Sequence, residues 1–281
     1  MRPAVDPCKW ALQLLRMSAC DGRTCWLVRS VAQPWSAWWL LAGHRSRARG
    51  TIPNRDQGRP DHNPPGEVQS VSIGVTGMLN RADVGHLEKL REVVVPESWG
   101  EELSYSVLPM RYASHEVWPT SLVVYLPGQL CGAYEFGILV RWGPVSSGSR
   151  NNPTSAGRFA LNWRSTGRSS TVDPEWFMPW YFNFANRDGL AFHAYPLPGY
   201  PASHGCIRLL ARDAQWLFEW GQTWMLDPSE TRVLSPGTPV FIVGRYDFDA
   251  APPWRSLAWL STTVDLAKVE MTDIDTPERS P

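Results

Sequence analysis

The sequence has no excess of either charge and few cysteines. Its 281 residues contain 27 basic and 27 acidic side chains, so it lacks the net basic character that nucleic-acid binding requires. Five cysteines are too few for a disulfide-rich scaffold, and their odd number leaves at least one thiol unpaired or shared between chains. What is present is 43% hydrophobic residues, including 16 tryptophans, enough for a substantial core. The 25 prolines and 22 glycines argue against a helical bundle.

Residues 1–66 do not have the pattern of a compact domain. They contain Cys8, Cys20 and Cys25 and end in a polar, proline-rich stretch that is typical of a linker. The apolar run Val31–Gly43 is shorter than the roughly 20 residues of a transmembrane helix, but it has the length of a signal-peptide hydrophobic region. Residues 10–20 loosely resemble a lipoprotein processing box. An export signal, an anchor, a disordered tail and a mis-set start all stay open.

Residues 67–117 are expected to form a small helical spacer. Asp83 has the position of an N-cap, and Pro96 of a helix end. Between them, four apolar residues fall on one helical face: Val84, Leu87, Leu90 and Val94. Nothing in this segment carries chemistry.

Residues 118–246 read as a β-rich domain. Leu122–Leu126 and Gly132–Trp142 predict strands of a hairpin, and further strands are expected over 157–163, 189–193 and 237–243. Asp213 is expected to cap a helix with one apolar face. Residues 247–281 form a proline-dotted, acidic tail whose role is open. The fold class is therefore mainly β (α+β).

A loop between a strand and a helix concentrates reactive side chains. His193, His204 and Cys206 lie close together in the sequence. Sulfur is nucleophilic as a thiolate, and a neighbouring imidazole can take the thiol proton. Gly205 would let the backbone approach closely, so that main-chain N–H groups stabilise an oxyanion, and Arg208 adds positive charge. Two alternatives remain from the residues alone: a zinc site made by the same three side chains, and a buried structural cysteine.

The residue string around Cys206 resembles the signature of the L,D-transpeptidase catalytic domain, the YkuD-like family. The family pairs an upstream histidine with a Ser/Thr-His-Gly-Cys block, and here the block runs from Ser203 to Leu209. The resemblance extends from about Trp118 to Tyr246. Further matching steps are Gln129 to Tyr134, Pro144 to Gly148, Asn152 to Phe159, Met178 to Phe182, Asp213-Ala214 and Gly237 to Val240.

The resemblance implies a β-sandwich or mixed sheet, with one principal helix after the catalytic loop. It also implies a peptidoglycan L,D-transpeptidase that needs no metal or cofactor, works in the cell envelope (periplasmic or exported), and binds stem peptides and carbapenem-type β-lactams. Cys206 would be the nucleophile and His193 the general base. Ser203, His204 and Gly205 would shape the catalytic loop.

Substrate contacts are expected from Arg208, Tyr195 and Trp180. Trp180 belongs to the aromatic segment 163–186, which is either a partial lid or core lining. Three departures from the family pattern bear on the substrate: a short interval from His193 to Ser203, Ala194 in place of glycine, and Ser155 in place of proline. Hydrolysis of the thioester by an L,D-carboxypeptidase, and a non-catalytic wall-binding or zinc-binding module, are the alternative functions.

Overall fold

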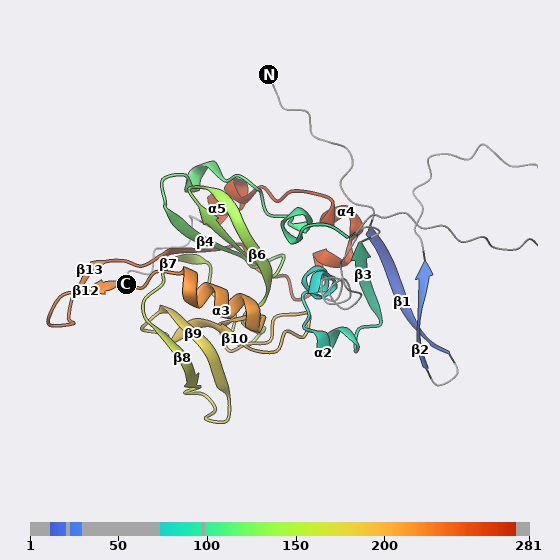
Figure 1. Cartoon of the computed structure of the whole chain (residues 1–281), viewed down its shortest axis with the longest axis horizontal. Helices are drawn as coiled ribbons and strands as arrows, with labels where there is room; N and C mark the ends of the chain where they lie inside the picture. The colour runs from blue at the N-terminus through green and yellow to red at the C-terminus, as the bar shows by residue number, and fades with distance from the viewer. Residues whose placement is uncertain (1–11, 21–22, 30–73, 97–98, 274–281) are drawn as a thin grey trace, which may run out of the picture.

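The computed structural model describes residues 12–20, 23–29, 74–96 and 99–273 (Figure 1). Within these ranges, one sheet has nine strands in the order β7-β14-β4-β5-β6-β11-β10-β9-β8. The β14–β4 and β10–β11 pairs are parallel and the other pairs antiparallel, so the expected mainly β, mixed sheet is confirmed. The strands are β4 Thr120–Tyr125, β5 Leu130–Glu135, β6 Ile138–Ser146, β7 Gly157–Ala160, β8 Arg164–Ser169, β9 Phe177–Ala185, β10 Leu190–Ala194, β11 Ile207–Leu209 and β14 Pro239–Val243.

The principal helix, α3 (Ala211–Trp220), follows β11 directly and covers one face of the sheet. Its Ala214 and Leu217 pack in one core cluster with side chains of the central strands, including Leu122, Phe192 and Ile207. The expected N-cap role of Asp213 is wrong. The helix begins after Leu210, and Asp213 lies inside the first turn with its side chain buried.

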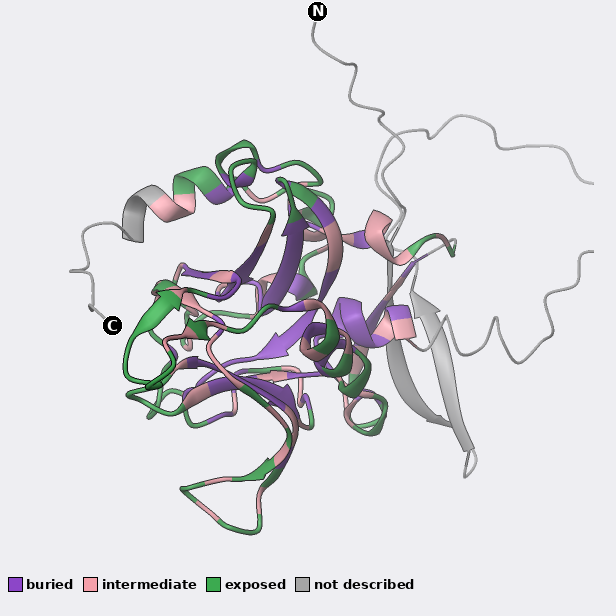
Figure 2. Ribbon diagram, turned by 60° about the vertical axis from the view of Figure 1, so that its left-hand side comes forward, coloured by how far each residue is buried: buried purple, intermediate pink, exposed green. Residues whose placement is uncertain are grey.

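The opposite face of the sheet is covered by the segments that flank the β-rich domain. Figure 2 shows buried residues continuing from the strands into these segments. A second core cluster joins Val123, Tyr134 and Phe241 of the sheet to Met78 on one flank and Leu266 on the other. The elements concerned are a helix over 74–80, η1 Glu102–Tyr105, η2 Ala113–His115, η3 Pro253–Arg255, α4 Leu257–Leu260 and α5 Leu266–Asp273. The expected boundaries at 118 and 246 therefore do not separate hydrophobic cores.

The expected helix from Asp83 is much shorter than the apolar spacing indicated. Asp83 is the N-cap, and its side chain accepts a hydrogen bond from His86 N at 3.0 Å. However, α2 ends at Leu87 (Val84–Leu87), and Glu92–Pro96 forms strand β3. Three consecutive valines favour a strand here, because β-branched side chains pack well on a pleated surface.

The expected targeting region is described only in part. Leu12–Cys20 (β1) and Arg23–Arg29 (β2) pair with each other, and β1 also pairs with β3. The apolar run at 31–43 lies outside the described residues. Within the described residues, no helix combines the length and the apolar character that a membrane crossing requires.

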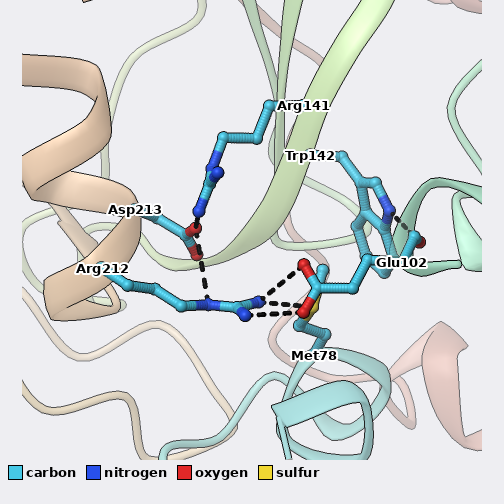
Figure 3. Close-up of polar contacts among 6 residues, drawn as sticks. All are labelled: Met78, Glu102, Arg141, Trp142, Arg212 and Asp213. Carbon is cyan, nitrogen blue, oxygen red and sulfur yellow. Dashed lines mark hydrogen bonds and ion pairs between the residues drawn. The ribbon is translucent and has the colours of Figure 1, made fainter. Parts of the chain in front are cut away.

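A polar network ties α3 to β6 and to the N-terminal flank (Figure 3). Arg141 Nη2 on β6 lies 2.6 Å from Asp213 Oδ1, and Arg212 Nε lies 3.7 Å from the same oxygen. Arg212 also pairs with Glu102 at 2.6 Å. Burial raises the pKa of Asp213, whereas the two guanidinium groups act in the opposite direction. The buried carboxylate therefore depends on Arg141 for most of its compensation.

Replacing Arg141 by methionine should lower the free energy of unfolding by about 3 kcal/mol, because it leaves a buried carboxylate without its partner. Urea denaturation measures the change. Combining Arg141→Met with Asp213→Asn should restore most of the loss, since the uncompensated charge is then absent. Equal stability of the single and double variants would contradict this account of the pair.

Candidate functional site

Two parallel neighbouring strands position the reactive side chains. β10 pairs with β11 so that Phe192 opposes Ile207 and His193 opposes Arg208. Phe192 and Ile207 belong to the core under α3. Because side chains alternate along a strand, His193 and Arg208 point to the other face, and Cys206, one residue before β11, lies on that face as well. The fold thus brings Cys206, His193 and Arg208 together.

Cys206 is a free, half-buried thiol. Burial raises its pKa above the usual value, and a backbone hydrogen bond with Ala191 and the charge of Arg208 act in the opposite direction. The thiol is therefore protonated at neutral pH, and it needs a base to become a nucleophile.

His193 is 4% exposed, and burial lowers its pKa to about 4, with the charge of Arg208 acting in the same direction. Its ring is consequently neutral at pH 7 and can accept a proton. Nδ1 lies 3.2 Å from the carbonyl oxygen of Ala194, which indicates that this nitrogen carries the hydrogen. Among the described residues, no hydrogen bond joins His193 to Cys206. The resting site therefore combines a neutral thiol with a neutral imidazole.

Hydrogen bonds hold the catalytic loop in shape. Gly205 has a φ of +105°, a conformation that favours glycine. Ser203 is buried, accepts a hydrogen bond from Gly205 N at 3.1 Å, and donates to the carbonyl oxygen of Cys206 at 2.5 Å. Since Gly205 N–H donates to Ser203, the main-chain N–H of Cys206 is the candidate oxyanion donor of this loop.

Thr154 joins this loop to the end of β6, a role that sequence reasoning missed. Its buried hydroxyl accepts a hydrogen bond from Gly148 N and donates to the carbonyl oxygen of Gly205, both at 2.8 Å. Thr154 lies in one of the steps that resemble the family pattern, and that position was the signal that could have found it.

Replacing Thr154 by valine keeps the shape of the side chain but removes both hydrogen bonds. Acylation of Cys206 should slow by about 10- to 100-fold, because a small displacement of a nucleophile is costly. Thr154→Ser, which keeps the hydroxyl, is the matched control and should react at nearly the wild-type rate. Timed intact-mass spectrometry measures both rates. If the serine and valine variants slow equally, the hydroxyl does not position the loop.

His204 is exposed, and its ring contacts the aromatic hairpin formed by β8 and β9. The Trp176 ring centroid lies 5.1 Å from that of His204. The hairpin therefore reaches the catalytic loop, and Trp176 is the side chain that makes the contact.

Arg208 and Tyr195 form a pair beside Cys206. The Arg208 guanidinium carbon lies 4.6 Å from the centroid of the Tyr195 ring, a cation–π contact. The same ring meets His193 edge-on, with a centroid distance of 5.8 Å. Tyr195 therefore contacts both Arg208 and His193, the cationic and the ionisable side chain near the thiol.

Trp180 does not join this group. Its backbone is left-handed, with a φ of +55°, and its ring packs 5.3 Å from Phe218 of α3, against the core on the helix side. The expectation of a substrate contact from Trp180 is not supported, because its side chain lies on the other face of the sheet from His193.

The structure also bears on the two alternatives that the residues alone left open, a zinc site and a buried structural cysteine. In the described ranges, no group of three or more His, Cys, Asp or Glu side chains is arranged to hold a metal ion. Cys131 is a buried free thiol on β5, and burial raises its pKa to about 12. A fully buried, protonated thiol is inert, so the half-buried Cys206 is the better candidate for a reactive thiol of these two cysteines.

Comparison with known families finds a match for part of the chain. Residues 119–242 match the model of the L,D-transpeptidase catalytic domain, YkuD. The resemblance inferred from the sequence motifs is thus confirmed for this part of the chain. The matched range contains both Cys206 and His193. A search of curated proteins found no match.

Solved structures of L,D-transpeptidases are also similar. The enzyme from Xylanimonas cellulosilytica is 24% identical, with a TM-score of 0.40, over 60% of this chain and 78% of that one. The enzyme from Stackebrandtia nassauensis is 24% identical, with a TM-score of 0.37, over 46% of this chain and 57% of that one, less than two thirds of its length. L,D-transpeptidase 3 from Mycobacterium tuberculosis, solved with a faropenem-derived adduct, is 17% identical, with a TM-score of 0.34, over 54% and 73%.

Proposed function

From the L,D-transpeptidase catalytic domain at residues 119–242, we propose that the protein is a cysteine-dependent peptidoglycan L,D-transpeptidase. The observation that carries the proposal is the position of Cys206 beside a neutral His193 and the cationic Arg208, on one face of two paired strands. A nucleophile, a proton acceptor and a positive charge are the groups that acyl transfer requires.

The chemistry proceeds in two steps. Cys206 Sγ attacks the carbonyl carbon of the third residue of a stem tetrapeptide, while His193 takes the thiol proton. The N–H of Cys206 stabilises the oxyanion, the bond to the terminal D-amino acid breaks, and His193 returns the proton to the leaving amine. An amine of a neighbouring stem then attacks the thioester carbonyl, and the carbon–sulfur bond breaks to give a 3→3 cross-link or a related wall attachment. The amine proton passes through His193 to the departing sulfur, which restores the thiol.

A neutral histidine suits this role. Because the pKa of His193 is lowered to about 4, the ring is free to accept a proton at the pH where most enzymes work. The pKa of the Cys206 thiol is raised, so proton transfer accompanies attack instead of preceding it. No step of the proposed reaction requires a metal or a cofactor.

The proposal includes the partners and the place of action. Peptidoglycan stem peptides are the substrates, and carbapenem-type β-lactams are covalent inhibitors, because their strained amide acylates an activated thiol. Peptidoglycan lies outside the cytoplasmic membrane, so the protein acts in the cell envelope.

Incubation with a tetrapeptide stem and a carbapenem tests the proposal. Intact-mass spectrometry should show one carbapenem adduct, and the stem should give cross-linked dimers together with free D-amino acid. Free tripeptide without dimers would instead identify an L,D-carboxypeptidase. The absence of both adduct and peptide turnover would refute a catalytic role.

A further inference from the structure

Arg208 lacks an anionic partner even though its side chain is half-buried next to the nucleophile. Elsewhere in the fold, the half-buried guanidinium of Arg141 pairs with Asp213, and even the exposed guanidinium of Arg212 pairs with Glu102. For Arg208, the described residues provide the ring of Tyr195 at 4.6 Å but no ion pair or hydrogen bond. Partly burying a guanidinium without an acceptor is unfavourable. Its position therefore indicates that an anion binds there during the reaction.

The geometry of the pair selects the shape of that anion. The Tyr195 ring covers one face of the guanidinium, and a guanidinium has its N–H donors at its edges. An edge with two parallel donors fits a carboxylate, which accepts both hydrogen bonds in one plane. The ring contact also limits the rotation of Arg208, so less side-chain entropy is lost on binding.

The distance from the nucleophile indicates which carboxylate fits. Cys206 and Arg208 are two residues apart on the same face, which corresponds to about 7 Å along an extended strand. In a peptide, consecutive Cα atoms are about 3.8 Å apart. A donor whose scissile carbonyl is at Cys206 would therefore place a carboxylate one residue further on within reach of Arg208.

We propose that Arg208 binds the free carboxylate of the donor's terminal residue, the residue that leaves when Cys206 is acylated; this inference rests on the proposed function. Cys206 Sγ bonds to the scissile carbonyl carbon, the carbon–nitrogen bond breaks, and the thiol proton passes to the leaving nitrogen. The terminal residue departs as a free amino acid from Arg208. The site thereby selects donors in which a carboxylate follows the scissile bond by one residue.

A matched pair of donors tests the inference on the full chain. The first is a stem tetrapeptide with a free C-terminal carboxylate, and the second is the same peptide with a C-terminal amide. Wild-type protein should release the terminal residue about 10 to 100 times faster from the acid, as expected for a charge-assisted hydrogen-bonded pair. A second acid and amide pair, in which the third residue has no carboxylate on its side chain, should show the same difference in rate. That result would exclude the side chain of the third residue as the group that Arg208 binds.

Arg208→Gln should abolish the preference, so that the acid and the amide react at similar rates, with the larger loss of rate on the acid. Arg208→Lys should restore part of the preference, because it keeps the charge but not the bidentate geometry. Arg168→Gln removes an exposed arginine from the neighbouring β8–β9 hairpin and should keep the full preference. The comparison of acid with amide is informative because a purely structural role of Arg208 would slow both donors alike.

Two results would overturn the inference while the proposed function stands: equal rates of wild-type protein with acid and amide, or equal losses on both donors in Arg208→Gln. The wild-type comparison decides the matter even if Arg208→Gln fails to fold. If no thioester forms with any donor or with a carbapenem, the proposed function itself fails, and the inference fails with it.

Discussion

Replacing Cys206 by alanine is expected to abolish the carbapenem adduct and all release of the terminal amino acid. In the proposed mechanism the sulfur atom forms the thioester, and no other nucleophile of the described site takes its place. The substitution removes one atom from a half-buried side chain, so the variant should remain folded. Intact-mass spectrometry after incubation with a carbapenem measures the loss.

Cys131 provides the matched control for this experiment. Its thiol is buried on β5 beneath α3, and burial raises its pKa to about 12. Cys131→Ala should therefore keep the full adduct. An adduct that persists in Cys206→Ala, or that disappears in Cys131→Ala, would show that Cys206 is not the nucleophile.

Replacing His193 by glutamine should slow acylation by about 100- to 10,000-fold, the usual contribution of a general base. Glutamine keeps a polar group near the carbonyl of Ala194 but cannot take up the thiol proton. Because the thiol pKa is raised, little thiolate forms at pH 7 without the imidazole. The rate of adduct formation, followed by timed intact-mass spectrometry, measures the effect.

The pH profile gives the same prediction an independent test. With the His193 pKa lowered to about 4, the ring is deprotonated above that value, so the acid side of the wild-type profile should fall near pH 4. His204→Gln changes an exposed histidine of the same loop and should leave this profile in place. A wild-type acid limb near the ordinary histidine value of about 6.5 would contradict the assignment of a buried, neutral base.

The sequence was sufficient to predict several of the strands and to propose Cys206 and His193 as the reactive pair. Short apolar runs predicted β4 and β10, and the Ser-His-Gly-Cys block pointed to Cys206. These features are local, so they depend on residues that are close along the chain. The parallel pairing of β10 with β11, which places His193 and Arg208 opposite each other, confirms that the block and the upstream histidine meet.

Features that depend on distant parts of the chain could not be predicted. The face occupied by Trp180 follows from the pairing of β9 with β10, in which Phe182 opposes Phe192 of the core under α3, and this register depends on residues outside β9. Asp213 has the residue type of a helix cap, but Arg141, 72 positions away, gives it a buried ion pair instead. The function of Thr154 depends in the same way on Gly205.

The burial that raises the pKa of Cys206 also affects how the protein withstands oxidants. Oxidation to sulfenic acid and exchange with disulfides both require the thiolate, which is scarce when the thiol stays protonated. An unoccupied site therefore presents a sulfur that peroxides and foreign disulfides attack slowly. In the proposed mechanism, its reactivity develops only when a substrate carbonyl arrives and His193 removes the proton, so the burial that delays ionisation would also preserve the nucleophile between turnovers.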